Sequence, residues 1–273
     1  WWATARVLPS LSELGAGDVI CLINGSFFGG ACAIVAAASA MYAISGALER
    51  LSPVAPLITL KDTVEVDVFR PFFADEKPVS VQLPVSLRDA APAVLTLVRA
   101  LRDSFDAIEG RLSRVSCNPL FADNGAHSQS SFLDFETTRS LRGLSLAVQL
   151  ASGLVQRLIT HQVDGSNPFG VQPPKIASAA LLAGRARSLP AFVGDDSRGV
   201  EDLRDLALLV AAELYISVGV LRELCEIYDG SIGVPDERRS QAFVESLSRL
   251  VVPDVPPDLM SFAAQIALPH RPF

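Results

Sequence analysis

The sequence predicts an all-α fold in which long antiparallel helices form a central bundle. Apolar residues recur at intervals of three and four over three long stretches, which is the period of a helix buried on one face. Strand-like alternation is confined to short pieces such as residues 64–68. Hydrophobic residues make up 49% of the 273 residues and charged residues 19%, enough for a sizeable core. We therefore expect residues 1–273 to form a single helical domain.

The first predicted helix is rich in small residues. The thirty residues between Asp18 and Glu49 carry no charge, and about 20 apolar residues suffice to cross a bilayer. However, the stretch contains Asn24, Ser26, several glycines and a run of alanines, and neither end has a basic cluster or an aromatic belt. We therefore expect no membrane span, but a helix that packs closely against others in the middle of a bundle.

Three longer apolar stripes follow. The first begins at Leu87 and runs to Val115, and Pro92 should kink or delay its start. The second, residues 135–163, contains no proline and would be ~40 Å long as a helix. The third runs from residue 203 to 228 and is closed by Asp229-Gly230. Stripes on several faces suggest that the subunit forms a homo-oligomer, a tetramer or a dimer. The predicted loops are residues 164–174, 188–200 and 252–258.

Charge and rare residues exclude several classes of function. The net charge is −7 with a pI near 5.0, so the surface would repel a phosphate backbone and we expect no nucleic-acid partner. Four cysteines lack paired spacing and three histidines are scattered, which predicts reduced thiols and no metal site. The N-terminus lacks a Met and a signal peptide, so we interpret it as processed, trimmed or incomplete, and we expect a cytoplasmic protein.

Three polar motifs stand in apolar surroundings; the third, residues 117–121 and 127–132, is a polar turn that leads into the predicted helix at 135–163, and the first two carry candidate binding groups. Asn24, in Leu-Ile-Asn-Gly-Ser at 22–26, could direct amide donors into a cavity at a helix N-terminus, or could simply cap that helix. Gln82 and Arg88 flank a turn from loop to helix, where a guanidinium could clamp a carboxylate through two parallel hydrogen bonds. The alternative for Arg88 is a solvated arginine in a first helical turn. None of the three by itself identifies an activity.

Taken in order and with their spacing, the motifs resemble the histidine and phenylalanine ammonia-lyase family, which includes the aromatic amino-acid aminomutases. Residues 22–26 are similar to the family's Leu-Ile-Asn-Gly-Thr, and residues 81–88 to its Val-Gln-Asp-Pro-Tyr-Ser-Leu-Arg. The other similar stretches are 117–121, 128–132, 155–159 and 200–202. The resemblance covers nearly the whole chain and corresponds to the C-terminal part of the family, so we expect the family's N-terminal part to be absent from this chain.

This resemblance implies an elongated helical subunit, a homotetramer, and active sites shared between neighbouring subunits. Family members use an electrophilic methylidene-imidazolone group made from an internal Ala-Ser-Gly in a segment before the first motif. Here the tripeptide occurs at 151–153, inside a predicted helix that cannot readily cyclise. Val85 stands where the family has a catalytic tyrosine, and Gly184 lies near the place of a functional glutamate. We therefore expect no cofactor and no ordinary ammonia-lyase chemistry.

The residues that match the family's pocket define the candidate site. Asn24, Gln82 and Arg88 would orient a substrate or stabilise developing charge. The rest of the pocket would be lined by Leu83, Val85, Phe132 and Glu201. Leu83 and Val85 make the pocket less polar than the family pattern, which favours a small-molecule substrate that is larger and more apolar than an amino acid.

The leading hypothesis is a repurposed lyase-fold enzyme that acts on an apolar or aromatic natural-product intermediate without the prosthetic group. Two alternatives stay open. The chain could be the C-terminal half of a two-chain ammonia-lyase or aminomutase, whose separate N-terminal chain carries Ala-Ser-Gly. It could also be a non-catalytic scaffold or regulatory subunit that keeps the helical bundle for assembly.

Overall fold

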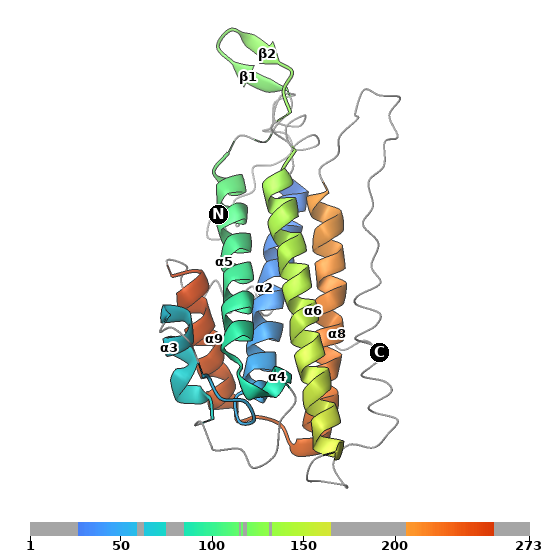
Figure 1. The fold of residues 1–273 in the computed structure, drawn as a ribbon. Coiled ribbons are helices and arrows are strands. Elements are labelled where there is room, and N and C mark those ends of the chain that lie inside the picture. Colours follow the sequence, from blue (N-terminus) through green and yellow to red (C-terminus); the bar gives the residue numbers. More distant parts are fainter. Residues whose placement is uncertain are drawn as a thin grey trace.

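The computed structural model describes residues 27–58, 63–74, 85–114, 116, 119–130, 133–164 and 206–253. Long helices side by side form an elongated bundle (Figure 1), which confirms the all-α prediction. The long helices are α2 (Phe27–Leu51), α5 (Ala91–Leu112), α6 (Phe135–Asp164), α8 (Ala207–Ile232) and α9 (Glu237–Val251). Shorter elements are α3 (Val64–Phe69), η2 (Arg70–Phe72), α4 (Val85–Arg88) and a hairpin of β1 (Leu120–Ala122) with β2 (Gly125–His127).

Helix α2 is the central helix of the bundle and contacts α5, α6, α8 and α9. Its small side chains allow these neighbours to approach, and Ala33, Ala37 and Ala40 are fully buried. The helix is long and apolar enough to cross a membrane, but 61% of its most apolar window is buried inside the bundle. The prediction of a small-residue core helix is therefore confirmed over the described residues 27–51.

Ion pairs fix the directions of the long helices. Arg50 and Asp229 pair through Nη2 and Oδ2 at 2.5 Å and so join the C-terminal turns of α2 and α8. Arg142 and Glu213 pair at 2.7 Å near the starts of α6 and α8. Helices α2, α6 and α8 therefore run in one direction, and α5 and α9 run in the other (Figure 1). The predicted antiparallel packing applies to α5 with α2 and α6, whereas α6 and α8 lie parallel because the chain between them, residues 165–206, is long enough to return.

Residues 64–68, which alternate like a strand, form helix α3 instead. A short alternating stretch cannot by itself be told from a helical turn, and the burial pattern shows which applies here. Val66 and Phe69 are both fully buried at a spacing of three, which places them on one face of a helix. Glu65 lies in the first turn, where a negative charge favours the helix dipole, and pairs with Arg102 of α5 at 3.1 Å.

The structure shows where helix α5 begins and where helix α8 ends. Helix α5 begins at Ala91 with Pro92 in its first turn, so proline delays the helix rather than kinking it. Helix α8 does not close at Asp229-Gly230 but continues to Ile232. It ends at Gly233, whose φ of 115° lies in the region that favours glycine. The predicted end of α8 was therefore wrong by about one turn.

Helix α9 is held against the bundle by an aromatic cluster and by polar contacts at its edge. The ring of Phe243 is fully buried and lies 5.9, 4.7 and 6.4 Å from the rings of Phe69, Phe72 and Phe73, measured between centroids. Arg239 donates through Nη2 to the Phe72 carbonyl at 2.9 Å. These contacts join the C-terminal helix to the segment that follows α2.

Glu49 is a buried carboxylate in this region and accepts a hydrogen bond from the Ser240 hydroxyl at 2.9 Å. Burial raises the pKa of Glu49, although the Ser240 hydrogen bond and the charges of Arg50 and Arg239 act against it. Because the folded state holds this proton more tightly than the unfolded chain, the group favours folding most below the ordinary carboxyl pKa. This contribution is lost as the pH rises through the raised pKa.

Glu49→Gln should therefore raise the melting temperature at neutral pH, and the gain should shrink as the pH falls to about 4. Glu65→Gln is the matched control with the opposite sign. The pKa of Glu65 is lowered by a hydrogen bond to its own backbone and, against burial, by Arg102, so its charged form stabilises the fold at neutral pH. Thermal melts of both variants between about pH 4 and pH 7 test these opposite pKa shifts. The same change of melting temperature with pH in the two variants would contradict them.

Candidate functional site

The predicted site residues fall into two groups along the sequence, according to the described helices that follow them. Asn24 and Phe132 each precede the first residue of a helix, α2 and α6, by three positions, and Glu201 precedes α8 by six. All three helices begin at the end of the bundle that carries the hairpin (Figure 1). Gln82, Leu83, Val85 and Arg88 belong instead to the segment that leads into α5. Asn24, Gln82, Leu83, Phe132 and Glu201 lie outside the described residues, so the structure places only Val85 and Arg88 directly.

Helix α4 presents Val85 and Arg88 on the surface of the subunit. Leu87 is fully buried and anchors the helix, while Val85 is 76% exposed and Arg88 is also exposed. Asp89 fixes the end of the helix, because its Oδ1 accepts hydrogen bonds from the backbone amides of Ile58 at 3.0 Å and Ala91 at 2.9 Å. Arg88 and Val85 are thus both exposed, three positions apart, on a short turn that Leu87 and Asp89 anchor.

Within one subunit, Arg88 lies far from the start of α2, the helix that Asn24 precedes by three positions. The hydrogen bond from Asp89 places Arg88 next to the segment just after α2, since Ile58 follows the last residue of α2 by seven positions. Helix α2 spans about 36 Å between its ends at 1.5 Å per residue. The three residues from Asn24 to Phe27 can recover at most about 11 Å of this distance. The described structure thus separates Arg88 from the first residue of α2 by roughly the length of that helix.

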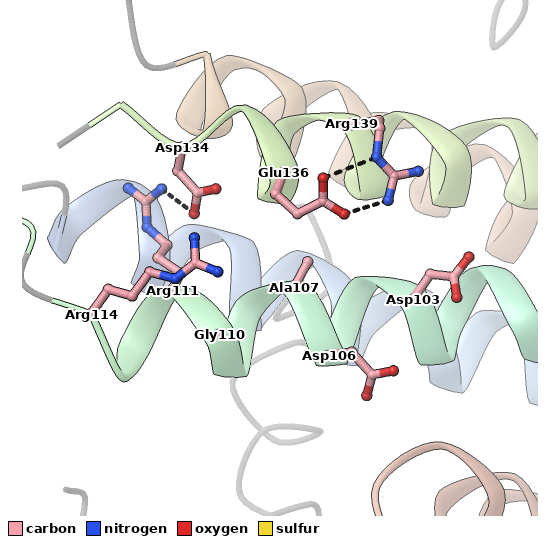
Figure 2. Close-up of a pocket in the computed structure, with 9 residues that line it drawn as sticks. All are labelled: Asp103, Asp106, Ala107, Gly110, Arg111, Arg114, Asp134, Glu136 and Arg139. Atoms are coloured by element: carbon pink, nitrogen blue, oxygen red, sulfur yellow. Dashed lines mark hydrogen bonds and ion pairs between the residues drawn. The ribbon is translucent and has the colours of Figure 1, made fainter. Parts of the chain in front are cut away.

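At the hairpin end, α5 and α6 enclose a pocket of about 340 Å³. Figure 2 shows Arg111 directed toward Asp134, and Glu136 paired with Arg139 along α6. Arg111 Nη1 lies 2.6 Å from Asp134 Oδ2, and the two side chains are only 5% and 12% exposed. The lining is mostly charged and consists of Asp103, Asp106, Ala107, Gly110, Arg111, Arg114, Asp134, Glu136 and Arg139.

Asp134 also caps helix α6. Its Oδ1 accepts from the Thr137 amide at 2.9 Å and its Oδ2 from the Thr137 hydroxyl at 2.5 Å. Burial alone would raise the pKa of Asp134, but the Thr137 hydrogen bonds and the Arg111 guanidinium outweigh it and lower the pKa. The carboxylate is thus ionised and saturated with partners at neutral pH, which suits a structural anchor better than a proton donor.

The tripeptide Ala151-Ser152-Gly153 lies in the middle of α6, as predicted. Ser152 is 2% exposed, and its hydroxyl donates to the Val148 carbonyl at 2.9 Å. Cyclisation would require the backbone to leave a regular, buried helix. The tripeptide in this setting does not fit the formation of a methylidene-imidazolone group, so no step of the mechanism below passes through that group.

The cysteines and potential metal ligands among the described residues form no second catalytic or metal centre. Cys225 is buried, and burial raises the pKa of its thiol to about 12, so it is no nucleophile near neutral pH. Cys225 and the half-buried Cys32 are both free thiols. Within the described ranges, no group of three or more His, Cys, Asp or Glu side chains could hold a metal ion. Cys21 and Cys117 lie outside these ranges.

The outer faces of α6 and α8 expose large apolar side chains. On α6, Leu146 is 66% and Leu150 40% exposed, and both line an open groove of about 540 Å³ that also includes Gln156 and Arg157. On α8, Tyr215 is 39% and Ile216 46% exposed. Exposed apolar side chains gathered on long helices are typical of surfaces that contact another protein chain.

Comparisons with known proteins identify the fold. No family model matches the chain, and no curated protein matches its sequence. Among solved structures, the tyrosine aminomutase from Streptomyces globisporus matches with a TM-score of 0.58 at 12% identity, over 98% of this chain and 67% of that chain. A tyrosine aminomutase mutant with bound ligand matches with a TM-score of 0.50 at 14% identity, over 97% and 66%. The chain therefore has the helical fold of the aminomutases and spans about two thirds of their length.

Proposed function

We propose that the chain is a lyase-fold enzyme subunit that binds an aromatic or apolar carboxylate, independently of a methylidene-imidazolone group. The observation that supports this most directly is helix α4, on which Arg88 and Val85 are both exposed, three positions apart. A guanidinium can hold a carboxylate through two parallel hydrogen bonds, and an adjacent valine favours an apolar body over a polar one. The aminomutase fold supports a small-molecule site of this class.

The proposed site is shared between two copies of the chain. One copy contributes Gln82, Leu83, Val85 and Arg88 from the end where α2 finishes. The other contributes Asn24, Phe132 and Glu201 from the end where α2, α6 and α8 begin. The length of α2 supports this arrangement, because it separates helix α4 from the start of α2 within one subunit. The apolar faces of α6 and α8 support a homo-oligomer in which such a site can form.

In this mechanism Arg88 binds the carboxylate of the ligand. The apolar part of the ligand is shielded from water by Val85, Leu83 and Phe132. The Asn24 and Gln82 amides donate hydrogen bonds to the oxygen on which negative charge develops. Glu201 remains a pocket residue without an assigned proton transfer. Binding and orientation are thus done by residues of this chain alone.

Binding of trans-cinnamate, an aromatic unsaturated carboxylate, tests the proposal by calorimetry. Arg88→Ala should raise its Kd by about 10- to 100-fold, the value of a charge-assisted pair. Cinnamyl alcohol, which lacks the carboxylate, should bind wild type and Arg88→Ala equally. Arg99→Ala is the control variant, because Arg99 is an exposed arginine on α5. Equal cinnamate affinity in Arg88→Ala, or no binding of either ligand to wild type, would contradict the proposal, and the second result would favour a scaffold.

A two-chain lyase is the second candidate, and one observation favours it. About a third of each matched aminomutase chain has no counterpart in these residues. A separate polypeptide could supply Ala-Ser-Gly to the shared site. Intact mass spectrometry of the native complex, together with its ultraviolet difference spectrum, separates the two candidates, because only the two-chain lyase requires a second polypeptide and the absorbance of the prosthetic group.

A further inference from the structure

The Arg111 side chain lies where three helices, α2, α5 and α6, come together at the hairpin end of the bundle. It belongs to the last turn of α5 and pairs with Asp134, the residue directly before α6. It also lies against α2, because a Cβ at Gly30 would stand 3.3 Å from Arg111 Nε and 3.6 Å from its Cδ. Gly30 therefore lets the second turn of α2 approach the arginine closely.

Because Arg111 and Asp134 are buried, their ion pair tolerates little change in the distance between the two side chains. A buried guanidinium is strongly unfavourable unless a carboxylate and further hydrogen-bond partners satisfy it. Both oxygens of Asp134 are occupied by Arg111 and by Thr137 of α6. Arg111 can therefore keep its partner only while α5 and α6 hold one relative position, and a shift of α2 toward α5 would press Gly30 onto the arginine.

The helix starts that Arg111 joins are those that follow two motifs of the proposed site. Gly30 lies six residues after Asn24, and Asp134 lies two residues after Phe132. We propose that Arg111 is a positioning residue, which sets the spacing between the starts of α2 and α6 and through them the half of the shared site that these helices carry. This inference rests on the proposed function, but its structural part can be tested alone.

The structural test is a distance measurement between the two helix starts. Spin labels at Phe28→Cys and Phe135→Cys use positions that are 70% and 56% exposed, in a full-length chain whose native cysteines are replaced by alanine. When labelled subunits are reassembled with an excess of unlabelled ones, so that only distances within one subunit are measured, pulsed dipolar spectroscopy should give one narrow distance distribution for this parent. Arg111→Met and Asp134→Asn should broaden or shift this distribution. Arg111→Lys keeps the positive charge but loses the two-pronged guanidinium, so its distribution should lie between those of the parent and Arg111→Met.

Arg142→Met provides the matched control. Arg142 and Glu213 form a cross-helix pair of similar length at 2.7 Å, between α6 and α8. Its loss should lower the melting temperature without changing the distance between the starts of α2 and α6. An unchanged distribution in Asp134→Asn and Arg111→Met, with a loss of stability like that of Arg142→Met, would overturn the inference. If Arg111→Met does not fold, the distance distributions of Arg111→Lys and Asp134→Asn test the inference: an unchanged distribution in both would overturn it.

Ligand binding adds a second readout that separates Arg111 from Arg88. A misplaced half-site should weaken trans-cinnamate and cinnamyl alcohol alike, by about tenfold or more, whereas Arg88→Ala should weaken only the carboxylate. Full affinity for both ligands in a variant whose distance distribution has changed would also overturn the positioning role. Failure of wild type to bind either ligand would count against the proposed function, and the distance measurement would still decide whether Arg111 sets the spacing.

Discussion

Replacing Leu146 and Ile216 together by arginine should convert the oligomer into monomers and abolish cinnamate binding. Both side chains are exposed on the long helices α6 and α8, where the proposed partner copy would cover them. Two guanidinium groups forced into an apolar interface would each cost several kcal/mol, more than a subunit contact of this kind can absorb. Light scattering coupled to size exclusion measures the mass of the particles directly.

The control for this experiment is Val234→Arg. Val234 is 83% exposed in the link between α8 and α9, so arginine there adds the same kind of charge outside the two apolar faces. This variant should keep the wild-type mass and affinity, and far-ultraviolet circular dichroism should be unchanged in both variants. A wild-type protein that is already monomeric, or a double variant that remains oligomeric and binds cinnamate, would contradict the assignment of this surface.

Phe243→Ala should lower the free energy of unfolding by about 3–5 kcal/mol, as expected for the loss of a fully buried phenylalanine. The ring fills the contact among Phe69, Phe72 and Phe73 and is the main apolar anchor of α9. Its removal leaves a cavity that the surrounding rings can close only in part. Denaturant unfolding at a fixed protomer concentration measures this loss without a change in oligomer population.

Gln241→Ala is the matched control on the same helix. Gln241 is exposed and donates to Glu245 at 3.1 Å, a surface contact on one helix. Its loss should change the free energy of unfolding by no more than about 0.5 kcal/mol. Comparable losses in the two variants would mean that α9 is not anchored through its aromatic cluster.

Much of the helical architecture follows from the periodicity of apolar residues. Helix α6 begins at Phe135, as its apolar stripe indicates, and α5 begins at the position that Pro92 favours. Residues 64–68 were misjudged because five alternating residues carry too little information, and the burial of Val66 and Phe69 by distant helices decided their structure. The end of α8 was misjudged because Gly230 is a common stop signal, whereas Gly233 adopts the positive φ.

The candidate site could be predicted only in part. The motifs indicated which residues to consider, but not that Val85 and Arg88 lie far from the starts of α2 and α6, along a helix about 36 Å long. The pair of Arg111 and Asp134 was missed because 23 residues separate its members and nothing in the local sequence joins them. An available signal was Asp134 three residues before Thr137, which is the spacing of an N-terminal helix cap.

Mixing two variants that each bind trans-cinnamate poorly tests the shared site most directly. Asn24→Ala and Arg88→Ala, each purified alone, should bind trans-cinnamate poorly because every site in either oligomer lacks one of the two side chains. After the subunits are dissociated and reassembled in equal amounts, random pairing should restore wild-type affinity in about a quarter of the sites. Recovery of that fraction would show that one copy supplies Asn24 and the other supplies Arg88. No recovery from a mixture proven by native mass spectrometry to contain mixed oligomers would contradict the account.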